Sequence, residues 1–441
     1  MLRVQTVHFH IRLYCILIFF TSLVPLYPEE NHTRTAFCQN KTFLPELSNC
    51  LAVHTPEVRM EEIKLKEISG RKRIASYLFP SNPSINGYLS SREGGPGFLP
   101  GSGIQTAGNF QVLVNQEIFT NGKREILQQI ADEEFRIQVL RLESIRRAVE
   151  YDIIKKIVRF RFLQWEEKNS LDTLHLVQEI KHISKARVKE GLSPGIEESL
   201  AEAEEIRIYK LWIQIHRLYQ NAQSELEILF GGILPKFPDG DQNWKLPVAF
   251  PKEKDELLFF ALKRRPEIQI SQEEIALGIL HQTQIRRDRV PNLTLGAFAQ
   301  NDGFNERVVG GMITMPVLIW RDFSGEIEVS KAKVETLREK QEFTARMVKR
   351  ESLVALTNFL TLAEELKLYD EKKMDRADSD IKNLQEAIRS GKIRLIDAIN
   401  QQRILLQTKL HYINTKSEYE LSELELYRVL GYDSQELVPK Q

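Results

Sequence analysis

The feature that most constrains the fold is a pair of long segments without proline. Residues 123–188 contain neither proline nor glycine, and residues 325–390 contain no proline and only an opening glycine. Apolar residues recur along them at helical spacing, for example at Leu353, Leu356 and Leu360. At ~1.5 Å per residue, a helix of about 65 residues would be a rod of roughly 100 Å. Such a rod is far too long for a globular domain, so the sequence predicts two exceptionally long helices.

Glycine marks the end of each long segment. Gly191 follows the first segment and Gly391 the second, and a further helical pattern begins a few residues after each glycine. These returning helices are expected to end near Gly231 and Gly232 in the first half and near Gly431 in the second, as glycine C-caps do. The sequence therefore predicts two long helical hairpins.

The same order of landmarks occurs twice along the chain. The helix starts at Pro56 and Pro266 are 210 positions apart, and the offset falls to 203 for Gly122 and Gly325. It falls further, to 200 at the hairpin glycines and to 199 between Gly232 and the matching glycine of the second half. A duplicated unit with small insertions and deletions produces such an ordered drift. The expected segments are a signal peptide at 1–27, an N-terminal extension at 28–50, a first repeat at 51–232, a linker at 233–255, a second repeat at 256–432 and a C-terminal tail at 433–441.

Each repeat also contains a pattern typical of a β-hairpin. A first helix is expected to open at the Pro-Glu pair and to run for about 25 residues. After it, the sequences NFQVLVNQ at 109–116 and NLTLGAFAQ at 292–300 alternate with a period of two, which predicts strands with one more apolar face. Stretches rich in Gly, Pro and Asn at 92–108 and 301–307 are expected to be the hairpin loops.

The N-terminus has the pattern of an export signal. The uncharged apolar run at 13–27 follows Arg3 and Arg12 and is too short for a comfortable membrane span. A short membrane anchor and a wrongly assigned start of the chain are the alternatives, because no obvious cleavage site is found before Pro28. Cys15 lies inside it without the small residues that usually precede a lipidated cysteine, so lipidation is disfavoured.

Cys38 and Cys50 are the remaining cysteines, and they form an even pair in a chain with an export signal. Two readings stay open from the sequence. The pair closes a small disulfide loop, or both residues are free thiols in a poorly ordered segment.

Charge and motifs point away from nucleic acid and from catalysis. The 61 basic and 61 acidic residues are interspersed, so no basic surface for nucleic acid is expected. The Gly-Lys pair in NGKREIL at 121–127 lacks the upstream glycine of a phosphate-binding loop. His175 and His182 lie two turns apart on one predicted helix without a third metal ligand. We therefore expect no enzyme, no cofactor and no metal site.

Neither the strands nor the helices are self-sufficient in a single chain. Two hairpins would leave strand edges unpaired, and the helical hairpins would leave apolar stripes uncovered. Association with further copies solves both problems. Strands that close into a barrel would place their apolar face towards lipid and their other face towards water, with the helices forming a hollow cylinder beneath.

With these features the chain resembles the TolC-like outer-membrane efflux proteins, within them the branch that serves heavy-metal and related resistance-nodulation-division pumps. The resemblance covers residues 50–432 and rests on ordered fragments such as QEIFTNGKR, MPVLIWRDFSG, KEGLSPGIEE and RSGKIRLIDA. It implies a mainly α-helical fold with a membrane β-barrel portion. In it, a homotrimer combines four strands per chain into a twelve-stranded barrel above a twelve-helix periplasmic tunnel. The long loop of the first strand pair and the atypical signal peptide depart from the family pattern.

The resemblance also implies a location and partners. The protein is expected in the cell outer membrane, extending into the periplasm. Its partners would be outer-membrane lipid, a periplasmic adaptor protein and an inner-membrane pump of the resistance-nodulation-division type.

The same resemblance assigns roles to particular positions. The family narrows its entrance with acidic side chains about six residues past the second hairpin glycine, which implies a gate at Asp397, with Asn400 one turn later and Glu197 as the counterpart in the first repeat. An alternative reading makes these acids ordinary residues at positive helix ends. The remaining implied positions are the adaptor-docking turns at Gly191, Leu192, Gly391 and Lys392 and the strand-to-helix junctions at Gly122, Pro316 and Gly325.

The expected function is that of a passive duct, which conducts substrates that the pump expels through the adaptor. A duct for type I protein secretion and a non-conducting coiled-coil scaffold are the alternatives. The period-two strands favour a duct, because a scaffold does not need them. Metal ions, drugs and polypeptides all stay open as substrates, because a wide water-filled duct selects weakly.

Overall fold

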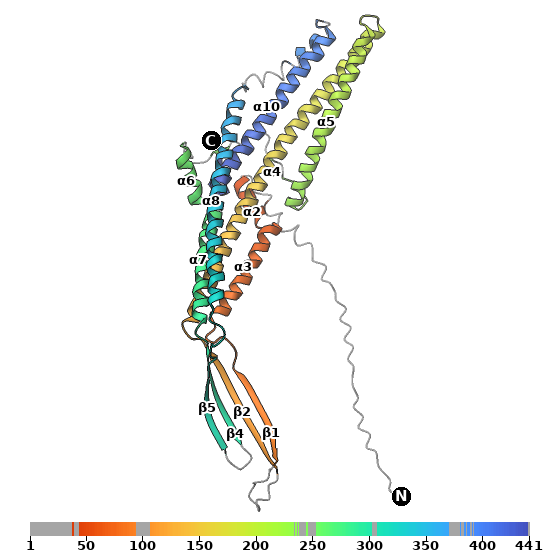
Figure 1. Cartoon of the computed structure of the whole chain (residues 1–441). Coiled ribbons are helices and arrows are strands. Elements are labelled where there is room, and N and C mark those ends of the chain that lie inside the picture. The colour runs from red at the N-terminus through yellow and green to blue at the C-terminus, as the bar shows by residue number, and fades with distance from the viewer. Residues whose placement is uncertain are drawn as a thin grey trace, which may run out of the picture.

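The chain forms an elongated molecule with helices along most of its length and four strands at one end (Figure 1). The computed structural model describes residues 38, 44–93, 106–232, 234–235, 237, 244–245, 253–301, 307–369, 380, 383–384, 386–388, 390 and 392–439. The predicted signal peptide and Cys15 lie outside the described residues.

The main helices follow the predicted repeat. In the first repeat they are α3 (Pro56–Ala75), α4 (Lys123–Lys189) and α5 (Gly195–Phe230). In the second repeat they are α7 (Pro266–Asp288), α8 (Ser324–Leu366) and α10 (Leu395–Val429). The first predicted rod is confirmed, since α4 is 67 residues long. The second predicted rod is wrong in its extent, because α8 ends at Leu366 after 43 residues and a turn follows at Lys367. None of the described helices combines the length and the apolar character needed to cross a membrane.

Both shorter helices begin at the predicted prolines. Pro56 and Pro266 are the first residues of α3 and α7, a position where the missing amide hydrogen costs nothing. Glu57 and Glu267 follow at the positive end of each helix. The lengths of 20 and 23 residues are slightly below the predicted length.

The repeat register differs from the predicted one at the ends of the returning helices. Gly231 after α5 and Gly431 after α10 have φ angles of 74° and 79°. The amide that follows each glycine donates to the carbonyl five residues back, from Gly232 to Glu227 at 2.7 Å and from Tyr432 to Tyr427 at 3.1 Å. Gly431 therefore corresponds to Gly231, and its predicted match with Gly232 is wrong by one residue.

The four strands form one antiparallel sheet. They are β1 (Ser84–Glu93), β2 (Thr106–Ile118), β4 (Leu293–Asn301) and β5 (Arg307–Thr314), in the order β1-β2-β4-β5. Each repeat supplies one hairpin, as predicted. β2 begins at Thr106, so the last residues of the predicted first loop belong to the strand.

The sheet register separates an apolar face from a mixed one. Ile85, Val114 and Ala297 stand side by side on neighbouring strands, and so do Val112, Ala299 and Val309 one pair further along. The exposed large apolar residues of this face are Ile85, Leu89, Phe110, Val112, Val114, Leu295, Val309 and Ile313. The opposite face carries Asn86, Tyr88, Gln111, Leu113, Asn115, Phe298 and Gln300. The predicted more apolar face is confirmed.

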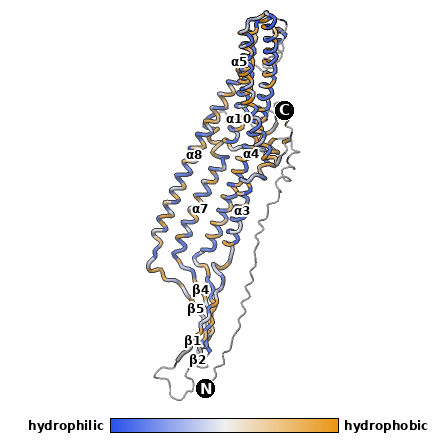
Figure 2. The backbone as a smooth tube through the Cα atoms, turned by 90° about the vertical axis from the view of Figure 1, so that its right-hand side faces the viewer, coloured by the Kyte–Doolittle hydropathy of each residue, from blue (hydrophilic) through white to orange (hydrophobic). Residues whose placement is uncertain are grey.

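The helices next to the sheet repeat the order of the strands. α3 packs on α4, α4 on α7, and α7 on α8, so that the layer reads α3-α4-α7-α8. Figure 2 shows α8 and α3 at the two outer edges of this layer. The sheet and this helical layer therefore have two free edges, one formed by α3 and β1 and the other by α8 and β5.

Shorter elements gather around the middle of α4. Helix α2 (Leu44–Ala52) packs against α4 and against the 3-10 helix η2 (Ser434–Glu436), and α6 (Lys254–Arg264) packs against α8. A two-residue strand of the linker, β3 (Trp244–Lys245), pairs with β6 (Val438–Pro439) in the C-terminal tail. The expected boundary at residue 51 falls within α2, because this helix belongs to the main core of the molecule.

Cys38 and Cys50 form a disulfide, with a Cα–Cα distance of 5.8 Å. Cys50 lies within α2, and Cys38 is fully buried in the same core. Of the two readings left open by the sequence, the structure has the bonded one. The bond ties the segment before α2 to the helix.

Candidate functional site

The first hairpin reverses through a glycine at the end of α4. Gly191 has a φ angle of 73°, and its amide donates to Val188 at 3.0 Å. The amide of Leu192 donates to Arg187 at 2.8 Å. These two bonds make a Schellman motif, in which a left-handed residue satisfies the last carbonyls of a helix. The predicted positive φ is therefore confirmed for Gly191, and Leu192 is exposed beside it.

The second hairpin shows the same bond 200 positions later. The amide of Lys392 donates to Ala387 at 3.0 Å, and that of Ser390 donates to Glu386 at 2.9 Å. Gly391 itself lies outside the described residues, and Lys392 is exposed. The two turns that the sequence pairs with each other therefore share the backbone hydrogen bond that closes the reversal.

The two returning helices begin in the same way. The N-cap residues Pro194 of α5 and Arg394 of α10 have φ and ψ angles of −67° and 147° and of −70° and 142°. Glu197 and Asp397 are each three residues past these caps, in the first turn. Two acids predicted to correspond therefore occupy equivalent positions at positive helix ends.

The caps give the two acids different surroundings. Arg394 donates from Nε to Oδ2 of Asp397 at 2.7 Å, and both side chains are exposed. Pro194 has no side-chain donor to offer Glu197. Asn400 is exposed one turn beyond Asp397, on the same side of α10. The tip of the second hairpin thus presents a paired carboxylate, a cation and an amide.

Apolar packing fixes which side of α10 is outward. Leu395, Ala398 and Ile399 are buried in a cluster with Leu176 and Ile180 of α4. The opposite side, with Asp397 and Asn400, therefore faces away from the rest of its own chain. The cluster joins the tips of the two hairpins and orients the acid.

A buried ion cluster lies between α5 and α10, just beyond the first turns of these helices, and it was not predicted from the sequence. Glu204 of α5 is only 2% exposed and accepts hydrogen bonds from Arg207 at 2.6 and 2.9 Å and from Arg403 of α10 at 2.8 Å. Burial by itself would raise the pKa of Glu204, but the two guanidinium groups outweigh it and hold the pKa below its usual range. The sequence did contain a signal for this contact, because Glu204 in the first repeat and Arg403 in the second have opposite charges at nearly equivalent positions.

The strand-to-helix junctions require a correction. Gly122 is the N-cap of α4 with a φ angle of 66°, whereas the N-cap of α8 is Phe323 with a φ of 62°. Gly325 lies within the first turn of α8, so its match with Gly122 is wrong by two residues. A left-handed phenylalanine costs roughly 1–2 kcal/mol, and Arg321 lies over its ring at 4.9 Å. Pro316 is exposed in the segment between β5 and α8.

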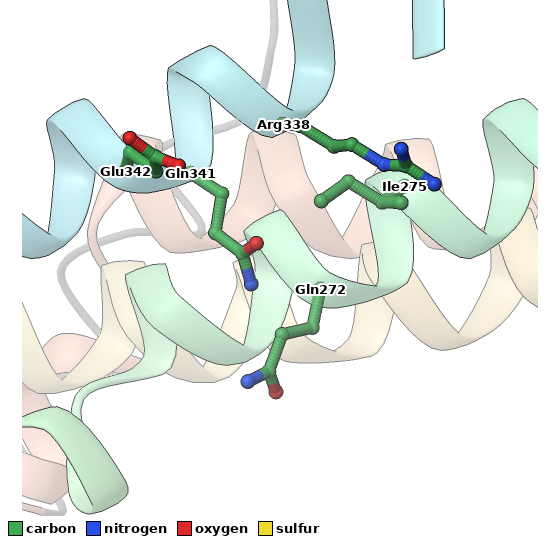
Figure 3. A pocket seen from close by; sticks show the side chains of 5 residues that line it. All are labelled: Gln272, Ile275, Arg338, Gln341 and Glu342. Atoms are coloured by element: carbon green, nitrogen blue, oxygen red, sulfur yellow. The ribbon is translucent and has the colours of Figure 1, made fainter. Parts of the chain in front are cut away.

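Two histidines and a surface groove lie away from the hairpin tips. His175 and His182 are both exposed on α4. Among the described residues, no group of three or more His, Cys, Asp or Glu side chains is arranged to hold a metal ion. A groove between α7 and α8 is lined by Gln272, Ile275, Arg338, Gln341 and Glu342, of which Arg338 and Glu342 lie at opposite ends (Figure 3).

Comparisons with known proteins agree with this geometry. Residues 259–432 match the family described as outer membrane efflux protein. The cobalt-zinc-cadmium resistance protein CzcC of Cupriavidus metallidurans is 20% identical over 324 residues, which cover 72% of this chain and 76% of the relative.

Two solved channel structures share the fold along nearly the whole chain. CusC superimposes with a TM-score of 0.69 at 13% identity and covers 88% of this chain and 92% of its own. The outer-membrane channel CmeC of Campylobacter jejuni gives a TM-score of 0.69 at 15% identity, covering 92% and 87%. These relatives are channel proteins rather than enzymes. The family match over residues 259–432 and the fold shared along nearly the whole chain together support a TolC-like outer-membrane efflux channel that extends into the periplasm.

Proposed function

We propose that three copies of this chain close into one channel that conducts metal cations out of the cell envelope. The observation that carries the proposal is the two-faced sheet with two open edges. A sheet with an apolar face cannot leave backbone groups unpaired in lipid, so β1 of one copy must pair with β5 of the next. The trimeric number comes from the resemblance to the family.

The helical layer supports the same closure. Met60 and Ile63 on α3 are exposed apolar residues at one free edge, and Val329, Phe343 and Val354 on α8 are exposed at the other. Burying exposed apolar side chains between copies removes them from water and stabilises an interface. Joining α3 of one copy to α8 of the next would cover exposed apolar residues of both helices at once.

The periplasmic tips are proposed as the entrance and as the docking end. Gly191, Leu192, Gly391 and Lys392 would meet a periplasmic adaptor, which links the channel to an inner-membrane pump. Three copies of Asp397 would form a ring at the entrance, because the packing of α10 turns this acid away from its own chain. Arg394, which is paired with Asp397, would partly neutralise the negative charge of this ring.

Divalent metal ions are the proposed cargo. The relative CzcC is named for resistance to cobalt, zinc and cadmium, and a ring of carboxylates attracts cations. The cargo claim is tested in a strain that lacks its own channel of this class. Restored resistance to zinc and cobalt but not to drugs supports it, whereas restored drug resistance alone contradicts it.

The entrance is tested by single-channel recording in planar bilayers. Removing the charge in Asp397→Asn should weaken block by a divalent cation added from the periplasmic side, and Arg394→Gln should strengthen it by freeing the carboxylate. Glu418→Gln is the matched control, because Glu418 is an exposed acid on α10 far from the tip. Equal block in all four proteins would eliminate Asp397 as the gate.

A further inference from the structure

Two exposed apolar segments lie where the sheet gives way to the helices. The first junction segment, Tyr77 to Phe79, connects α3 to β1, and the second junction segment, Val317 to Trp320, connects β5 to α8. Every side chain in both segments is exposed, and Trp320 is 95% exposed. Single exposed apolar residues are ordinary, but contiguous ones mark an interaction surface.

The second junction segment belongs to the longer of two corresponding connections. Residues 119–122 suffice to connect β2 to α4, whereas residues 315–323 connect β5 to α8. The end of this longer loop is braced on its own helix, since the amide and hydroxyl of Ser324 donate to Asp322 at 3.0 and 2.8 Å. Arg321 donates to Glu326 at 2.8 Å. These local bonds hold the loop in place while its apolar side chains remain uncovered.

The first junction segment is held against the body of the protomer. Arg124, at the start of α4, donates to the carbonyl groups of Ser76 and Tyr77 at 3.1 Å each. Gln116 of β2 donates to the carbonyl of Ser81 at 2.9 Å. Because its backbone is already fixed, the segment is a preformed surface that loses little conformational entropy on binding.

The two segments lie on opposite edges at the same level of the molecule. β1 begins at Ser84, just after the first segment, and β5 ends at Thr314, just before the second. Figure 1 shows all four strands leaving the helices at this level. A ring of identical copies joins opposite edges of neighbouring copies. Closure of the ring therefore brings the two kinds of segment together.

We propose that Trp320 of each copy packs onto Tyr77, Leu78 and Phe79 of the next copy, so that three such contacts form an apolar girdle at the sheet-to-helix boundary. This inference rests on the proposed trimer. A second copy is the proposed occupant, because the unpaired backbone groups of β1 and β5 need a partner that lipid cannot supply. Once those strands pair between copies, the two segments at their ends become neighbours.

Cysteine cross-linking tests the contact in outer-membrane fractions. The double variant Leu78→Cys with Trp320→Cys should give dimers and trimers on a non-reducing denaturing gel, and reductant should return them to monomers. Each single variant should run as a monomer. The matched control is Ile228→Cys with Trp320→Cys, because Ile228 is 83% exposed near the end of α5 but lies away from the junction. Its bands should stay monomeric.

An amine-reactive cross-linker applied to the same samples reports the trimer independently. If the amine-reactive cross-linker gives trimers but Leu78→Cys and Trp320→Cys form no disulfide, the girdle is wrong and the channel proposal stands. If neither the cross-linker nor the introduced cysteines give anything but monomers, both the girdle and the trimeric channel are wrong. Brominated phospholipid adds a direct test of the lipid reading. The quenching of Trp320 is measured as the difference between the unaltered protein and Trp320→Phe. If brominated lipid quenches Trp320 and the disulfide fails to form, the loop contacts lipid and the girdle is wrong.

Discussion

Arg403 on α10 donates a hydrogen bond at 2.8 Å to Glu204 on α5, and this bond joins the two helical hairpins one step behind their tips. The acceptor is almost fully buried, while Arg403 reaches solvent. A buried carboxylate with two cationic donors is held far more firmly than a surface pair. The contact therefore couples the first repeat to the second at the end proposed as the entrance.

Glu204→Gln is expected to loosen the two tips from each other. The variant keeps the shape but loses the charge that both guanidinium groups bind, at a cost of about 1.5–3 kcal/mol. Amide hydrogen exchange should accelerate at the starts of α5 and α10. Glu202→Gln is the control, because Glu202 is exposed on the same helix and should leave exchange unchanged. Equal protection in both variants would show that the apolar cluster alone holds the tips.

Gly191→Ala is expected to destabilise the first hairpin turn through its backbone. A methyl group at this position would meet no atom within 4 Å, so only the left-handed φ of 73° opposes it, at about 1–2 kcal/mol. Gly195→Ala is the matched control, since Gly195 has equal space but an ordinary φ and opens α5. Thermal unfolding should separate the two variants, and Gly191→Asn should recover part of the loss because asparagine tolerates this conformation.

Glu133 should make the protein less stable as the pH rises. Burial and the neighbouring Glu273 of α7 raise the pKa of Glu133 to about 7, although Arg136 on the same helix opposes this. The folded state therefore holds a proton that the unfolded chain has released, and stability falls between about pH 4.5 and 7. The other charges nearby are already paired, Lys72 with Asp132 at 2.8 Å and Arg71 with Glu134 at 4.0 Å.

Denaturant titrations at pH 5 and pH 8 check this expectation. Glu133→Gln should match the native protein at pH 5 and exceed its stability at pH 8. Adding Glu273→Gln to that variant should bring little further gain, because the two carboxylates oppose each other. A Glu133→Gln variant with unchanged pH dependence would rule out the pair as the cause.

Reduction of the Cys38–Cys50 disulfide should release α2 from the core. The bond closes a short loop with a sequence separation of 12, and loops of this size lose roughly 3 kcal/mol of stabilisation when opened. Cys50→Ser should lower the midpoint of thermal unfolding by the same amount as reductant does. Reductant should then have no further effect on the variant, and any additional loss would assign its action to another site.

The sequence by itself determined the features that depend on local chemistry. The absence of proline and glycine over 123–188 predicted α4 correctly. The same absence over 326–390 overestimated α8, which ends at Leu366 without a proline or glycine there. Gly191 marked the hairpin turn, since a left-handed C-cap favours glycine. The period of two predicted both hairpins and the more apolar face of the sheet. Ordered landmarks revealed the duplication.

Only the tertiary structure decided which distant residues meet. The hydrogen bond between Glu204 and Arg403 depends on how two hairpins pack, and no local pattern encodes that. Phe323 takes the left-handed position that the sequence comparison gave to Gly325, because glycine is favoured but not required where surrounding contacts hold the backbone. The exposed Trp320 could likewise be proposed as a contact between copies only because the strand order places the end of β5 at a free edge. Contacts between elements follow from packing geometry, which the order of residues along the chain does not show.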